Sequence, residues 1–156
     1  RVGLHGRPFE ILKFRTMAHA PDANGALITV AGDRRITGVG RALRASKLDE
    51  LPQLFNVVRG DMSIVGPRPE VPRYVAHYPA ALRDKVLSVR PGITDIASIE
   101  YRDESAVLAR AVDPERAYID EVLPHKLALA ASYVDQASVW LDIRLILRTI
   151  GAIVRG

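Results

Sequence analysis

Two neighbouring carboxylates and a set of basic side chains are the residues in this sequence whose types suit chemistry on phosphate groups. The acids are Asp49 and Glu50. The basic residues lie in short motifs on either side of them: Lys13, Arg15, Arg68, Arg90 and Arg102. Arginine binds phosphate oxygens bidentately, and several fixed cations neutralise a diphosphate and align it for in-line attack. Together these residues indicate phosphate chemistry.

Asp49 is the candidate nucleophile, because an aspartate that attacks phosphorus forms an aspartyl-phosphate and divides one displacement into two steps. Glu50 would assist it. A Mg²⁺ ion shared with the diphosphate would offset the repulsion between the anions. Acids in the first turn of a helix also stabilise the helix dipole, and a single arginine is most often a surface charge. The pair alone leaves both interpretations open, and the occurrence of several arginines on stiff turns favours chemistry.

The segments around the two acids are predicted from their residue patterns. Pro8 to Met17 is apolar with cations at alternating positions, which predicts a strand or strand-like arm that projects Lys13 and Arg15 from one face. Residues 18 to 40 are dense in turn formers and predict a long surface loop. Ser46 as an N-cap, followed by leucines at helical spacing, predicts a helix from Lys47 to about Arg59 that ends at Gly60.

Two proline turns are expected to hold the basic residues. Gly-Pro-Arg-Pro follows a short apolar run and fixes the backbone around Arg68. Arg90-Pro91-Gly92 is the second turn, and it precedes a predicted strand from Ala97 to Tyr101 that ends at Arg102. These turns would place guanidinium groups on rigid loops. Rigid loops hold a substrate in the position that the reaction needs.

The C-terminal third is predicted to be helical. From Asp113 onward the pattern is mostly helical, and Pro124 predicts a break in the helix. Ser138 to Arg155 carries Trp140 and regularly spaced apolar residues interrupted by arginines, which suits either a core helix or a helix at a membrane interface.

Composition limits the class of protein. The 156 residues are 48% hydrophobic, which predicts one compact domain. The segment patterns together indicate a small α/β domain, mostly helical, with short strands around the active-site loops. The absence of cysteine excludes thiol catalysis and thiolate zinc sites, and the four histidines have no metal-ligand spacing. Residues 1–102 carry a net charge of +6 and residues 103–156 a net charge of −2, so anions are expected to bind the first part.

Four motifs, read in order, resemble the bacterial sugar transferase family of monotopic phosphoglycosyl transferases. The motifs are KFRTM, LDELPQLFNVVRGDMSIVGPRPEVP, RPGIT and DPERAY. The block from Leu48 to Pro72 is the most specific of them, and the match runs along nearly the whole chain. A departure is Asp95 after RPGIT, where many relatives have glycine.

The resemblance implies that residues 1–156 are a single catalytic domain that moves a sugar-1-phosphate from a UDP-sugar to polyprenyl (undecaprenyl) phosphate and releases UMP. In that scheme Asp49 is the nucleophile and approaches Mg²⁺, and Glu50 completes the catalytic dyad. Three residues match basic positions of the family's phosphate site: Lys13, Arg68 and Arg102. Arg15 and Arg90 are weaker members of the same site. The product would begin the assembly of a bacterial surface glycan.

The resemblance also implies a membrane location, on the cytoplasmic face of the bacterial inner membrane. Family members look to carry an N-terminal hydrophobic hairpin, which we do not expect within this chain because it begins inside the motif region. The helix with Trp140 would lie at the membrane surface, since tryptophan and arginine favour that position. Whether the protein forms homo-oligomers is left open by the sequence.

Three other functions compete with the transferase. A net charge of +4 suits a nucleic-acid-binding module, but such a module interleaves basic residues with stacking aromatics, and aromatics are 6% here. We therefore expect no nucleic-acid partner. A non-catalytic membrane scaffold would not need intact Asp49 and Glu50. A phosphohydrolase would use the same residues with water as the acceptor.

Overall fold

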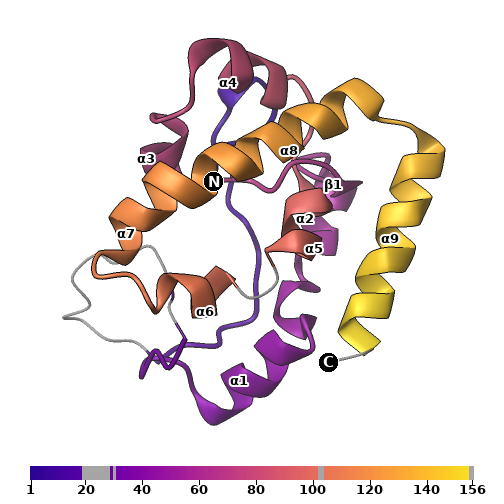
Figure 1. The fold of residues 1–156 in the computed structure, drawn as a ribbon. Helices are drawn as coiled ribbons and strands as arrows, with labels where there is room; N and C mark the ends of the chain where they lie inside the picture. The colour runs from indigo at the N-terminus through magenta and orange to yellow at the C-terminus, as the bar shows by residue number, and fades with distance from the viewer. Residues whose placement is uncertain (19–28, 30, 102–103, 155–156) are drawn as a thin grey trace.

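The computed structural model of the chain describes residues 1–18, 29, 31–101 and 104–154. Within them the fold is mostly helical, with one small sheet (Figure 1). The helices are α1 (Gly38–Ala45), α2 (Gln53–Arg59), α3 (Pro72–Val75), α4 (Ala80–Val86), α5 (Ile96–Glu100), α6 (Glu104–Leu108), α7 (Pro114–Ala117), α8 (Leu123–Gln136) and α9 (Val139–Val154). Single 3₁₀ turns lie at Leu4–Gly6 and Leu48–Glu50, and a π-helical turn lies at Tyr118–Val122. The predicted fold class is confirmed.

The sheet consists of β1 (Ser63–Val65) and β2 (Gly92–Thr94), paired in parallel with Ser63 opposite Gly92. The connection between the two strands carries α3 and α4, as a parallel pair requires a long crossover. Gly66, directly after β1, and Gly92, at the start of β2, lie in close contact: a Cβ on Gly92 would lie 2.1 Å from the Gly66 nitrogen. Only glycine at position 92 allows this approach, which brings the two predicted proline turns side by side.

Helix α8 is the centre of the hydrophobic core. Figure 1 shows it running diagonally across the molecule, with α9 standing to one side. Each of the three buried clusters takes residues from it: Leu123 in the first, Leu127 in the second and Tyr133 in the third. Burying a leucine-sized side chain contributes roughly 1.5–3 kcal/mol, so this one helix organises most of the apolar packing.

Residues 8–17 form the predicted strand-like arm, without a regular partner strand. The fully buried side chain of Asn56 takes the partner's place. Its Oδ1 accepts a hydrogen bond from the Leu12 nitrogen at 3.0 Å, and its Nδ2 donates to the Glu10 carbonyl at 2.8 Å. These bonds satisfy an extended backbone that would otherwise need a neighbouring strand.

The predicted loop over residues 18–40 is partly wrong, because α1 already begins at Gly38. Residues 19–28 and 30 lie outside the described residues. Thr37 caps α1, since its Oγ1 accepts a hydrogen bond from the Gly40 nitrogen at 2.9 Å. Gly40 is required because a Cβ there would lie 2.0 Å from the Thr16 carbonyl oxygen. The helix thereby packs directly on the arm.

The predicted N-cap at Ser46 is wrong. Ser46 ends α1 instead, and its Oγ donates to the carbonyls of Ala42 and Leu43. A serine hydroxyl bonds backbone groups at either end of a helix, so the sequence pattern did not decide between them. Lys47 then turns the chain with a left-handed φ of 57°, and the predicted single helix is a 3₁₀ turn followed by α2, which ends at Gly60 as predicted.

The predicted strand from Ala97 to Tyr101 is also wrong, because this segment contains α5. Asp95 begins the helix: its Oδ1 accepts a hydrogen bond from the Ser98 nitrogen at 2.6 Å. The strand predicted after the second proline turn lies earlier, at β2. Five residues that alternate between apolar and polar do not distinguish a strand from a short helix, and the N-cap aspartate decides the outcome.

The predicted break at Pro124 does not end the helical run. The chain is helical from Pro114 to Gln136, and Pro124 lies in the first turn of α8. The π-helical turn Tyr118–Val122 precedes it. A proline removes one donor and crowds the carbonyl four residues earlier, and the wider π turn accommodates both effects.

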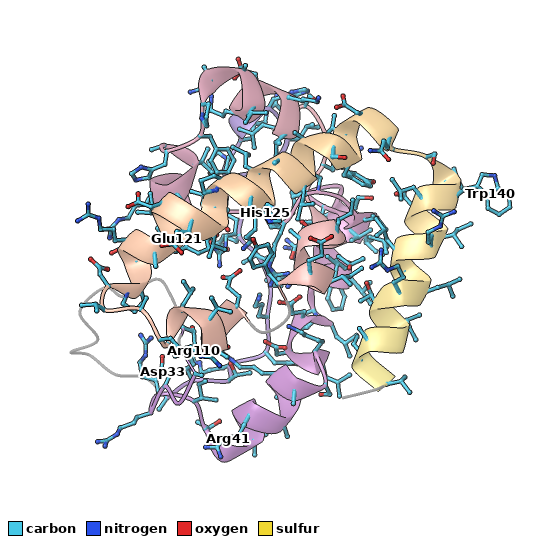
Figure 2. The ribbon with its side chains drawn as sticks, viewed as in Figure 1. Asp33, Arg41, Arg110, Glu121, His125 and Trp140 are labelled. Carbon is cyan, nitrogen blue, oxygen red and sulfur yellow. The ribbon has the colours of Figure 1, made fainter. Side chains whose placement is uncertain are left out.

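Helix α9 buries one narrow side, at Leu145, and leaves most of its apolar residues exposed. Trp140, near its start, is 79% exposed and points away from the rest of the molecule (Figure 2). The exposed residues favour the interfacial alternative over a core helix. In the described ranges, no helix combines the length and hydrophobicity that crossing a bilayer requires.

Candidate active site

The 3₁₀ turn Leu48–Glu50 presents both candidate acids from one point of the chain. The Phe14 nitrogen donates to the Asp49 carbonyl at 2.9 Å, so the arm that carries Lys13 is tied to the turn. Asp49 is buried, with 7% of its surface exposed. The sequence predicted the closeness of Asp49 and Glu50, and the fold adds the arm beside them.

Glu50 is the centre of an ion-pair network. Lys13 Nζ donates to Glu50 Oε1 at 2.7 Å. The guanidinium of Arg68 binds both oxygens of the same carboxylate: Nη2 donates to Oε1 at 2.5 Å and Nη1 to Oε2 at 3.3 Å. Two residues that are 37 and 18 positions away from Glu50 therefore meet on it.

The network alters the charges of its members. Burial alone would raise the pKa of Glu50, but attraction to Arg68 and Lys13 outweighs burial and lowers that pKa to about 2. Partial desolvation and the nearby Arg68 lower the pKa of Lys13, and Glu50 opposes that change. Glu50 is therefore ionised at neutral pH and holds two cations beside Asp49.

The loop that carries Arg68 is fixed at its backbone as well as at its side chain. The Arg68 nitrogen donates to Asp95 Oδ2 at 3.1 Å. Asp95 is 3% exposed, and its other oxygen begins α5. The residue that departs from the family pattern thus connects the Arg68 loop to the first turn of a helix.

Asp49 differs from Glu50 because its carboxylate has no hydrogen bond or ion pair with any described residue. It lines an open cavity of about 750 Å³ together with Lys13, Glu50 and Arg68. A carboxylate that faces a cavity without a bonded partner is available to a ligand or a reaction. The arrangement suits nucleophilic attack by Asp49 in a cavity that fixed cations also line.

The cavity holds cations that the sequence analysis did not select. Among the residues that the structure describes, seven basic side chains line it, against four acids. The basic residues are Arg1, Lys13, Arg41, Arg44, Lys47, Arg68 and Lys126. Arg44 is held by Thr16, whose Oγ1 accepts from its Nε at 2.8 Å. The spacing of Arg41 and Arg44 in a helix was the available signal, since residues three apart share a helix face.

A second charged group lies on the cavity wall around Lys126, which the sequence analysis also missed. Lys126 Nζ donates to Glu104 Oε2 at 2.9 Å and lies 3.7 Å from Glu70 Oε1. The Tyr118 hydroxyl bonds Glu70, and burial together with that carboxylate raises the pKa of Tyr118. Each of these four side chains has a partner within the group, so the group suits a rigid part of the cavity wall. No local pattern links residues so far apart in the sequence.

Two of the predicted phosphate-binding residues do not line this cavity, and the position of a third is not described. Arg15 is exposed and does not belong to its lining. Arg90 donates from its Nε to the Gly60 carbonyl at 2.8 Å and so supports the end of α2 instead. Arg102 lies outside the described residues. The structure brings together Lys13, Asp49, Glu50 and Arg68.

Asp49 also suits the predicted metal role. In the described part of the chain, no group of three or more acidic or histidine side chains could hold a metal ion by itself. Mg²⁺ often uses only one or two protein carboxylates and takes its other ligands from substrate phosphates and water. The unpaired Asp49 carboxylate fits that way of binding, whereas the oxygens of Glu50 are occupied by Lys13 and Arg68.

Comparison with known proteins identifies similar sequences. The family model described as bacterial sugar transferase matches residues 1–156. The chain is 38% identical to the UDP-glucose:undecaprenyl-phosphate glucose-1-phosphate transferase of Caulobacter vibrioides, over 96% of this chain and 53% of that protein. It is 36% identical to the UDP-N-acetylgalactosamine-undecaprenyl-phosphate N-acetylgalactosaminephosphotransferase of Aeromonas hydrophila, over 100% of this chain and 34% of that protein. A UDP-glucose:undecaprenyl-phosphate glucose-1-phosphate transferase of Xanthomonas campestris pv. campestris is 40% identical, over 96% of this chain and 29% of its own length. The chain spans about half or less of the length of these relatives.

Proposed function

The chain belongs to the bacterial sugar transferase family, and on that premise we propose that it transfers a sugar-1-phosphate from a UDP-sugar to polyprenyl phosphate. The observation that carries this proposal is the Asp49 carboxylate, which has no hydrogen bond or ion pair with a described residue and lines the same cavity as Lys13 and Arg68. A cavity of about 750 Å³ lies in the size range of small-molecule sites, and its surplus of cations suits a diphosphate.

In the first step, an oxygen of Asp49 attacks the phosphorus that bears the sugar. An O–P bond forms to Asp49, and the bond between that phosphorus and the bridging oxygen of the diphosphate breaks, so the bridging oxygen stays on the nucleotide's phosphate. UMP leaves with that electron pair, and the sugar phosphate stays on Asp49. Lys13 and Arg68 lie where they would stabilise the negative charge that moves onto the leaving phosphate.

In the second step, an oxygen of polyprenyl phosphate attacks the same phosphorus. The bond to Asp49 breaks, the carboxylate is restored, and the product is a polyprenyl-diphosphate sugar. Two displacements at one aspartate allow the donor and acceptor to react in turn. The product would begin the assembly of a bacterial surface glycan.

Glu50 acts in this scheme through the cations that it holds. With a pKa of about 2, Glu50 stays ionised at neutral pH and is poorly suited to donate a proton. Its two oxygens fix Lys13 and Arg68, so it is a positioning residue. Asp49 would hold a Mg²⁺ ion that arrives with the diphosphate, and the ion would supply further charge neutralisation.

The membrane location is part of the proposal. The exposed apolar residues of α2 and α9, which include Phe55 at 65% and Trp140 at 79% exposure, suit contact with a bilayer surface. A polyprenyl phosphate resides in that bilayer, so the cavity would have to open close to it. We place the protein on the cytoplasmic face of the inner membrane, where UDP-sugars are available.

The test is UMP release from a panel of UDP-sugars, measured with Mg²⁺ in detergent, with and without polyprenyl phosphate. We expect sustained UMP release with one sugar, only when the lipid phosphate is present. Sustained release without lipid would identify a hydrolase instead. No release with any sugar, under conditions in which a curated relative is active, would contradict the transferase function.

A further inference from the structure

A second, apolar cavity of about 200 Å³ lies beside the charged one. Its wall is mainly hydrocarbon: Leu51, Leu54, Ile93, Ile99, Ala152 and Ile153. The hydroxyls of Thr94 and Thr149 also line it, but they hydrogen-bond to each other at 2.7 Å. Ser98 also lines the cavity, and its hydroxyl has no hydrogen-bond partner among the described residues. Because the rest of the wall away from the junction is apolar, a hydrocarbon chain bound here would be removed from water at little cost.

The apolar cavity meets the charged cavity at three residues, Lys47, Glu50 and Arg68, which line both. Lys47 is exposed and makes no ion pair with any described residue. Asp49 lines the charged cavity alone. A ligand that placed an anionic group at this junction would therefore lie beside two cations and close to the nucleophile, with the rest of the molecule in the apolar cavity.

The apolar cavity continues toward the outside of the molecule. Ile99 and Ala152 also line an open groove of about 850 Å³ along α9. The groove contains Trp140, Ile143 and Leu147 as apolar lining, with Arg144 and Arg148 among them. Figure 2 shows Trp140 at the outer side of α9. Charged cavity, apolar cavity and groove form a row in which neighbours share wall residues.

We propose that the apolar cavity and the α9 groove hold the first isoprene units of the acceptor, with its phosphate at the Lys47 junction. The inference rests on the proposed function and adds where the acceptor binds. A prenyl phosphate is a linear molecule with an anionic end and a hydrocarbon chain, and the row of cavities changes from charged to apolar in the same order. A UDP-sugar, which is polar throughout, is confined to the charged cavity by the same argument.

The first experiment labels the unmodified chain. A farnesyl phosphate with a photoreactive diazirine in its first isoprene unit is bound and irradiated, and the labelled peptides are mapped by mass spectrometry. We expect label on the cavity wall, at Leu51, Leu54 or Ile153, and competition by unlabelled polyprenyl phosphate but not by phosphatidylglycerol. Label elsewhere would overturn the inference. Equal competition by phosphatidylglycerol would assign the cavity to membrane lipid and would also overturn it.

The second experiment fills the cavity with Ala152→Phe. We expect the KM for polyprenyl phosphate to rise at least about tenfold, because the ring occupies space that the prenyl chain needs. The single release of UMP that accompanies loading of Asp49, without acceptor, should persist. Ala42→Phe, the same change at an exposed position of α1, is the matched control and should leave the acceptor KM unchanged.

The two experiments separate the inference from the proposed function. An unchanged acceptor KM in a folded Ala152→Phe protein would overturn the cavity assignment while leaving the transferase function in place. If the unmodified chain releases no UMP from any UDP-sugar, the proposed function fails, and the photolabelling still decides whether the cavity binds a prenyl phosphate.

Discussion

The charged cavity and the apolar side of α2 and α9 each combine side chains that have partners within the protein with side chains that do not, but the partners differ: ion pairs in the cavity and apolar packing on the helices. In the cavity, Glu50, Lys13 and Arg68 satisfy one another, whereas the Asp49 carboxylate has no hydrogen bond or ion pair with a described residue. On α9, Leu145 is 1% exposed and packs in the core, whereas Trp140 is 79% exposed. In both regions a few residues hold the structure and leave others to meet a ligand or a surface. Substitutions of the two kinds should therefore have opposite effects on stability and function.

The largest expected effect is that of Asp49→Asn on transfer. The amide is a poor nucleophile, so UMP release should fall by at least about 10³-fold. The free energy of unfolding should change little, because the Asp49 carboxylate makes no hydrogen bond or ion pair with a described residue that the substitution would break. Enzyme assays and urea unfolding measure the two quantities. Asp135→Asn, at an exposed carboxylate paired with Lys85, is the control. Near-normal activity in a folded Asp49→Asn protein would refute the assignment of Asp49 as the nucleophile.

The next effect is a loss of stability in acid that depends on Glu50. Because the pKa of Glu50 is lowered from 4.5 to about 2, its ionised form contributes stability above pH 4.5 that is lost as the pH falls toward 2. The contribution is about 3 kcal/mol. Urea unfolding of the unmodified chain and of Glu50→Gln should therefore differ most near neutral pH and converge in acid. Glu121→Gln, at an exposed residue, should show a difference near zero throughout.

Arg68→Lys should reduce transfer by about 100-fold, although the charge is kept, because a lysine cannot bind both oxygens of Glu50 and a phosphate at once. The kinetic comparison is with Arg73→Lys. Arg73 is an exposed arginine of α3 that pairs with Glu115, and its replacement should have little effect. Equal, small effects of both substitutions would remove Arg68 from the phosphate site.

The smallest effect on stability is expected on the exposed side of α9. Trp140→Ala should change the free energy of unfolding by less than about 0.5 kcal/mol, and it should weaken binding to anionic vesicles in a sedimentation assay. Leu145→Ala, on the buried side of the same helix, should cost about 2–5 kcal/mol. If Trp140→Ala were as destabilising as Leu145→Ala, the exposed side of α9 would be part of the core.

The sequence predicted the charged residues of the site better than it predicted the helices and strands that carry them. Asp49, Glu50 and Arg68 lie in one motif block, so their closeness followed from short spacing and a stiff proline turn. Lys13 was expected in the site because its motif resembles the family's, and the bond from the Phe14 nitrogen to the Asp49 carbonyl is what brings the arm there. The partners of that arm were not predictable, because Asn56 replaces a strand through side-chain bonds that no periodicity reveals.

The errors have local physical causes. Ser46 and Asp95 are both cap residues, and their direction depends on which neighbouring segment becomes helical. The sequence predicts Ser46 as the N-cap of a helix, but Ser46 is the C-cap of α1. Asp95 was not predicted to be a cap, and it is the N-cap of α5. The group around Lys126 was missed for a different reason, since it depends on pairing between elements far apart in the sequence.

The covalent intermediate on Asp49 is the most direct test of the account. The chain is incubated with the UDP-sugar that the panel selects, in the absence of acceptor, and then digested and analysed by mass spectrometry. The account predicts one UMP released per chain and a sugar phosphate on the peptide that contains Asp49, which polyprenyl phosphate then removes. An unmodified Asp49 peptide, with UMP released only when donor and acceptor are both present, would contradict it.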